Sequence, residues 1–131
     1  MKNRYRRGAD FERELVSMFW DHGWSALRAA GSGTTTYPVP DVVAFSEKHA
    51  LAVECKTTGK DRLSLRKAVL ALQRFLENTR AIGVIAVKFL RKEPRFYTLD
   101  MIERRGNYTI HVRDPYLSFD ALVGAQKRLV K

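Results

Sequence analysis

Apolar residues recur at helical spacing in three parts of the chain. Over residues 8–22 they return every three or four positions, as on one face of an amphipathic helix. A second stripe of this kind follows Ser64, whose hydroxyl we expect to cap the helix. A third covers about residues 118–129. The pattern therefore predicts three helices, one near the start, one in the middle and one at the end.

Short runs of β-branched and aromatic residues separate these helices. We expect strands at residues 24–30, 42–45, 50–53, 81–90, 95–99 and 108–112. The turn-like residues 46–49 would join the second and third strands into a hairpin. The resulting order α, β, β, β, α, β, β, β, α predicts an α/β fold in which a mixed β-sheet is flanked by helices.

Length and composition indicate one globular domain over residues 1–131, with residues 1–7 as a basic arm. The single cysteine, Cys55, excludes an internal disulfide and a thiolate zinc cluster within one chain. The longest apolar run, residues 82–87, ends at Lys88 and is too short to span a bilayer. Because the amino terminus also lacks the apolar stretch of a secretory signal, we expect a cytoplasmic protein that does not enter a membrane.

The formal net charge is +10, from 24 Lys and Arg against 14 Asp and Glu. A field of this sign attracts a polyanion, so nucleic acid is the first candidate partner. In the basic arm, Arg4, Arg6 and Arg7 would contact the phosphate backbone, which positions a protein without reading sequence. The alternative is a solvated charged tail.

Candidate chemistry lies in the predicted hairpin. Around Glu54, apolar Val53 and Cys55 alternate with Glu54 and Lys56, so a strand would direct the two charged side chains to one face. The hairpin would bring Asp41 beside Glu54. These carboxylates are hard oxygen ligands for Mg²⁺ or Mn²⁺, and the peptide carbonyl of Cys55 could complete the set. Lys56 would then contact the scissile phosphate or the attacking water, which predicts a metal-dependent nuclease.

A simpler interpretation treats Glu54 and Lys56 as a surface ion pair worth less than about 1 kcal/mol. Asp41, preceded by Pro40 and placed opposite in the hairpin of a basic chain, favours the site instead. Cys55 as a nucleophile would need a nearby base, and the spacing of the three histidines provides none. We therefore expect its side chain to be a small buried apolar group.

The same residues carry a family resemblance. Pro40-Asp41, the spacer of residues 42–53, and Glu54-Cys55-Lys56 resemble the PD-(D/E)xK nuclease superfamily, which implies the restriction-endonuclease-like core. Segments 8–15, 28–33, 85–89 and 124–127 resemble the archaeal Holliday junction resolvases, so the likeness extends over nearly the whole chain.

This resemblance implies further site residues. Glu12 would be a third acidic group that binds metal directly or through water. Arg13 and Arg28 would hold phosphate groups, since one guanidinium can bind two phosphate oxygens at once. Ser32 would approach the scissile backbone. Without the resemblance, Arg13 and Arg28 are ordinary solvated charges, and the loop around Ser32 is a flexible connection.

The resemblance also implies a magnesium-dependent, structure-selective endonuclease that nicks opposing strands of a four-way DNA junction in recombination and repair. A C2 homodimer would supply the two active sites. Candidate interface residues, which could equally be core, are Phe89, Leu90, Phe96, Tyr97, Met101 and Ile102, with part of the last helix. The alternatives are another nuclease of the superfamily, acting on linear or damaged DNA, and a DNA-binding module that cuts nothing.

Overall fold

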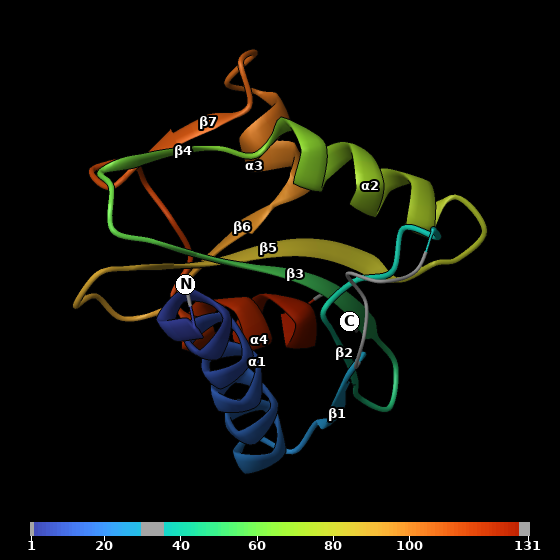
Figure 1. The fold of residues 1–131 in the computed structure, drawn as a ribbon. Coiled ribbons are helices and arrows are strands. Elements are labelled where there is room, and N and C mark those ends of the chain that lie inside the picture. The colour runs from blue at the N-terminus through green and yellow to red at the C-terminus, as the bar shows by residue number, and fades with distance from the viewer. Residues whose placement is uncertain (1, 30–35, 129–131) are drawn as a thin grey trace.

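A five-stranded mixed sheet forms the centre of the protein (Figure 1). The computed structural model describes residues 2–29 and 36–128, and among them the side chains of residues 7–29 and 36–124. The strands, in their order across the sheet, are β1 (Ser25–Arg28), β2 (Val42–Phe45), β3 (Ala50–Thr58), β5 (Ile82–Phe89) and β6 (Arg95–Thr98). All neighbouring pairs are antiparallel except β3 and β5, which are parallel. The expected mixed sheet is therefore confirmed.

Helices cover both faces of this sheet. The helices α1 (Lys2–Asp21) and α4 (Phe119–Arg128) lie on one side, and α2 (Arg66–Leu76) and α3 (Leu99–Glu103) lie on the other (Figure 1). The parallel pair β3 and β5 requires a crossover connection, and α2 provides it. A second, two-stranded sheet joins β4 (Arg62–Ser64) to β7 (Thr109–His111) beside α3.

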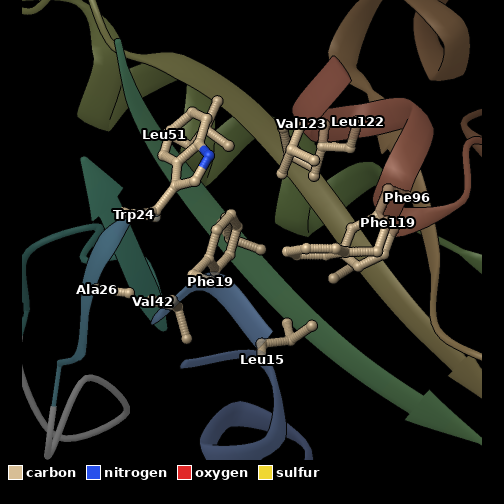
Figure 2. Packing of buried hydrophobic residues seen from close by; sticks show 14 of the residues in the cluster. Leu15, Phe19, Trp24, Ala26, Val42, Leu51, Phe96, Phe119, Leu122 and Val123 are labelled. Atoms are coloured by element: carbon tan, nitrogen blue, oxygen red, sulfur yellow. The ribbon is translucent and has the colours of Figure 1, made fainter. Parts of the chain in front are cut away.

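Two apolar clusters hold the layers together. On the α1 side, the ring of Phe119 meets Phe19 edge-on with 5.0 Å between centroids, and it meets Phe96 at 5.7 Å (Figure 2). On the α2 side, Val69 and Ile85 belong to a second buried cluster. The spacing that predicted the three helices is thus explained, because each apolar stripe faces the sheet.

Most of the residues considered for a subunit interface belong to this core. Phe89, Phe96, Tyr97 and Ile102 are buried within the chain itself, at 2% exposure or less. Leu90 differs, since 54% of its surface is exposed. For the four buried residues, the core interpretation is therefore the correct one.

Several expected boundaries were wrong. The helix α1 begins at Lys2, so residues 2–7 are helical and do not form a separate arm. Ser64 does not cap α2: it pairs with Thr109 in the small sheet, and Leu65 takes the N-cap position without a side-chain hydrogen bond. The strand expected at residues 108–112 is β7, which pairs with β4 rather than with the main sheet.

Strand β2 has the expected bounds, and β3 continues beyond the expected residues 50–53 to Thr58. The remaining strands and helices follow the prediction with shorter ends, while β4 and α3 were not expected at all. No helix in residues 2–29 and 36–128 combines the length and the apolar composition that crossing a bilayer requires.

Candidate active site

The β2–β3 hairpin brings Asp41 and Glu54 together. Val42 pairs with Val53, and the backbone N–H of Asp41 donates to the carbonyl oxygen of Val53 at 3.1 Å. The Oδ2 atom of Asp41 accepts a hydrogen bond from the backbone N–H of Cys55 at 2.8 Å. Asp41 is therefore fixed against the strand that carries Glu54, as the hairpin interpretation predicted.

The electrostatics of Glu54 reflect this proximity. Burial raises the pKa of Glu54 to about 7, the negative charge of Asp41 adds to the rise, and a side-chain hydrogen bond with Asp41 favours the protonated form. Lys56 acts in the opposite direction, with its Nζ 3.9 Å from Oε2 of Glu54. Near neutral pH, the ionised form of Glu54 is therefore disfavoured, and an added positive charge would favour it.

Glu12 joins the site from α1. The Nε–H of Arg28 donates to Oε1 of Glu12 at 3.1 Å, in an ion pair that is largely screened from solvent. Burial raises the pKa of Glu12, the charge of Asp41 raises it further, and Arg28 lowers it. Arg28 lies on β1 opposite Val42, and Ala29 donates its N–H to the carbonyl of Asp41 at 2.9 Å. Helix α1 and strands β1 to β3 thus assemble one acidic site.

The donor set fits a divalent cation. Carboxylate oxygens are the ligands that Mg²⁺ and Mn²⁺ prefer. Burial and mutual repulsion disfavour two negative charges at Asp41 and Glu54, so a cation between them would offset this cost. Among the side chains that the structure describes, no three His, Cys, Asp or Glu groups converge as a ready metal cluster. Glu12 is engaged by Arg28 instead.

The other predicted site residues are distributed differently. Arg13 lies on the surface of α1 and pairs with Asp10 at 3.3 Å. Arg7 is exposed on the same helix. Arg4 and Arg6 belong to α1, but their side chains lie outside those that the structure describes, and Ser32 lies outside the described residues altogether. The structure therefore groups Glu12, Arg28, Asp41, Glu54 and Lys56, and it places Arg7 and Arg13 on the adjoining helix surface.

The thiol of Cys55 belongs to the core. Its side chain packs against the α1-side cluster. Burial raises the pKa of this thiol well above its ordinary value, and the acidic neighbours raise it further. A thiol that stays protonated is a poor nucleophile, so the expectation of a small buried residue agrees with the structure.

The sequence did not show that cations from three segments form one basic groove beside the site. Lys60 and Arg91 line it together with Arg7, although they lie far apart in the chain. They meet because β3 and β5 are parallel and in register, with Thr58 opposite Phe89. No local sequence pattern predicts that pairing, so the sequence did not bring these cations together.

Comparison with known proteins agrees with this arrangement. Residues 3–130 match the model of the archaeal Holliday junction resolvase family. A crossover junction endodeoxyribonuclease Hjc of Archaeoglobus fulgidus is 37% identical over 75% of this chain and 73% of its own length. The Hjc of Methanocaldococcus jannaschii is 30% identical over 98% of this chain and 96% of its own.

A solved structure supports the fold. The Holliday junction resolvase Hjc of Archaeoglobus fulgidus superposes with a TM-score of 0.79 at 34% identity, over 88% of this chain and 98% of that one. This confirms the predicted α/β nuclease-like fold. Resolvase nucleases of this kind generally use divalent metal ions. From the family match and from relatives that cover most of its length, we conclude that the chain belongs to the archaeal Holliday junction resolvase family.

Proposed function

We propose that this chain is a structure-selective endonuclease that nicks two opposing strands of a four-way DNA junction and so releases two duplexes. The observation that carries the proposal is the pairing of Asp41 with Glu54 beside Lys56, in a chain with a net charge of +10. Relatives named as crossover junction endodeoxyribonucleases support the choice of substrate. Because this substrate arises from chromosomal DNA, we also propose that the protein acts in the cytoplasm, in recombination and repair.

The proposed cofactor is Mg²⁺, with Mn²⁺ as a substitute. The cation would be held by Asp41, Glu54 and the peptide carbonyl of Cys55. Glu12 would contribute through water, since its carboxylate already accepts a hydrogen bond from Arg28. When bound, the cation supplies positive charge beside the phosphate and makes a water molecule more acidic. The raised pKa values of Glu54 and Glu12 support this assignment, because such carboxyl groups gain most from a neighbouring cation.

The cations of the site have separate proposed roles. Lys56 keeps 41% of its side chain exposed, so its ammonium can contact the scissile phosphate or the attacking water while it remains near Glu54. Arg28 holds Glu12 through Nε, and we assign phosphate contact to its terminal nitrogens. Arg13 is proposed to hold a neighbouring phosphate from the surface of α1, and Ser32 to approach the scissile backbone. Pre-positioned charges of this kind lower the barrier without reorganising during the reaction.

Two symmetric cuts require two active sites, so we propose a C2 homodimer. An apolar surface supports it. Helix α2 contacts β3 and β5, whereas on the same face of the sheet β1 and β2 present Leu27 at 53% exposure and Phe45 at 47%. A second copy would cover these side chains. Sedimentation of the wild type as a monomer at micromolar concentration, with and without DNA, would remove the geometry for paired cutting.

The Asp41→Asn variant tests the site. It removes one negative ligand and retains size and shape, so cleavage of an end-labelled junction in Mg²⁺ should fall below detection while junction binding persists. Asp21→Asn is the matched control, because Asp21 is exposed at the end of α1 and its replacement changes the net charge equally. Continued cutting by Asp41→Asn at the rate of the control would overturn the assignment of the metal site.

A further inference from the structure

A groove of about 460 Å³ lies where the N-terminal half of α1 meets the ends of β3 and β5. In Figure 1 these three elements meet beside the N marker. The groove is lined by Arg7, Lys60, Lys88 and Arg91, by the acidic Asp10 and Glu14, and by threonine and apolar residues. Its lining does not include Asp41 or Glu54, and of its residues only Arg7 was assigned a phosphate contact above.

The charges of the groove do not cancel. Glu14 pairs with Lys88 at 2.9 Å, and Asp10 pairs with Arg13 at 3.3 Å, so both acidic residues are compensated. In the part of the chain that the structure describes, no ion pair includes the remaining three cations of the groove: Arg7, Lys60 and Arg91. The groove therefore presents an excess of positive charge toward any anion that enters it.

Lys60 and Arg91 lie in two turns that are joined by a backbone hydrogen bond. The backbone N–H of Leu90 donates to the carbonyl of Thr58 at 3.0 Å, which joins the segment after β5 to the end of β3. The N–H of Lys60 donates to Oγ1 of Thr58 at 3.1 Å. Arg91 has a left-handed backbone, with a φ of 61°. The side chains of Lys60 and Arg91 therefore start from a fixed pair of backbone positions.

The groove begins close to the proposed point of cutting. Thr57 and Thr58, which line it, directly follow Lys56 on β3. At about 3.3 Å per residue along a strand, Thr58 lies about 7 Å beyond Lys56. The groove therefore starts next to the residue that is proposed to contact the scissile phosphate.

We propose that this groove binds the sugar–phosphate backbone of a junction arm beside the cut. Lys60, Arg91 and Arg7 bind phosphate oxygens, and the exposed Leu90 contacts deoxyribose between them. Because such contacts read no bases, they add affinity for any sequence and fix the arm relative to the active site. The inference rests on the proposed function, since it assumes that the ligand is a DNA junction.

A pair of matched double variants tests the groove. Lys60→Gln with Arg91→Gln removes two of its cations. Lys48→Gln with Arg80→Gln removes the same charges from exposed positions that precede β3 and β5, at the opposite ends of these strands. Binding of a four-way junction is measured in chelator over a range of salt concentrations, with sedimentation confirming that both variants retain the mass of the wild type.

Log affinity falls linearly as log salt rises. Loss of two phosphate contacts makes this fall shallower, reducing the magnitude of the slope by about 2 for each groove that the junction fills. We expect this change in the groove variant and a near-wild-type slope in the control variant. Equal slopes for the two variants would overturn the proposal, because the effect would then be one of net charge. A groove variant with the slope of the wild type would also overturn it.

Neutral methylphosphonates, introduced one at a time along the cut strand, locate the contact. A run of positions on one side of the cut should weaken binding by the wild type and have little further effect on the groove variant. Equal weakening of both proteins at every position would contradict the groove. Cleavage by the wild type is scored separately in Mg²⁺, so a failure of the proposed function is distinguishable from a failure of this inference.

Discussion

Replacing Glu54 by Gln should stabilise the metal-free protein at high pH. The pKa of Glu54 is raised from 4.5 to about 7 by burial and by the charge of Asp41. A carboxyl group whose pKa is higher in the folded state binds its proton more tightly there. Its contribution to stability is therefore complete below about pH 4.5 and is lost as the pH rises through about 7. Gln keeps a hydrogen-bond donor toward Asp41 and does not ionise.

The magnitude follows from the pKa values. Because each pKa unit corresponds to about 1.4 kcal/mol, a rise from 4.5 to about 7 gives about 3 kcal/mol as an upper estimate. The side chain of Glu54 is 21% exposed, so solvent screening removes only part of this. In chelator at pH 8, Glu54→Gln should thus exceed the wild type in free energy of unfolding by up to about 3 kcal/mol. At pH 4.5 the two proteins should be nearly equal.

Urea unfolding in chelator at pH 4.5, 6 and 8 measures this difference. Glu47→Gln, at an exposed turn position, is the control and should show no such dependence. Saturating Mg²⁺ should then stabilise the wild type more than Glu54→Gln, because the cation binds through the ionised carboxylate. A stability difference that stays constant from pH 4.5 to 8, or a variant that is less stable than the wild type at pH 8, would refute the electrostatic reasoning.

Three further outcomes are expected. Arg28→Gln removes the partner that lowers the pKa of Glu12, so junction cleavage should fall by about 10- to 100-fold and its pH profile should move upward, whereas an unchanged profile would contradict the ion pair. Phe119→Ala, which removes the ring contacts of Phe119 with Phe19 and Phe96, should cost about 3–5 kcal/mol in urea unfolding, and a loss below about 1 kcal/mol would contradict the packing in Figure 2. Phe45→Glu places a charge on the uncovered β1–β2 surface and should shift the sedimenting species to monomer, while a dimer of unchanged affinity would exclude this face.

The hairpin was predictable because the residues that determine it are close together in the sequence. Alternation around Glu54 sets which side chains share a face, and the turn of residues 46–49 sets which residues pair. The proximity of Asp41 and Glu54 could therefore be predicted from the sequence. The apolar stripes of the helices are equally local, and each was found in the correct part of the chain.

The features that were missed depend on contacts between distant segments. Ser64 has the chemistry of a cap, but pairing with Thr109 draws it into β4. Residues 1–7 were expected to form a basic arm, yet α1 begins at Lys2, although cations are unfavourable in the first turns of a helix. The parallel register of β3 and β5, which forms the basic groove, has no signal within either strand.

Cleavage of an end-labelled four-way junction, beside a linear duplex of the same sequence, tests the central claim most directly. The reaction is run in Mg²⁺ and in chelator and resolved on a denaturing gel. The account predicts symmetric nicks in two opposing strands of the junction, in Mg²⁺ alone, with the duplex intact. Equal cutting of the duplex would contradict the selectivity for junctions, and tight junction binding without cutting in any divalent metal would contradict the enzymatic function.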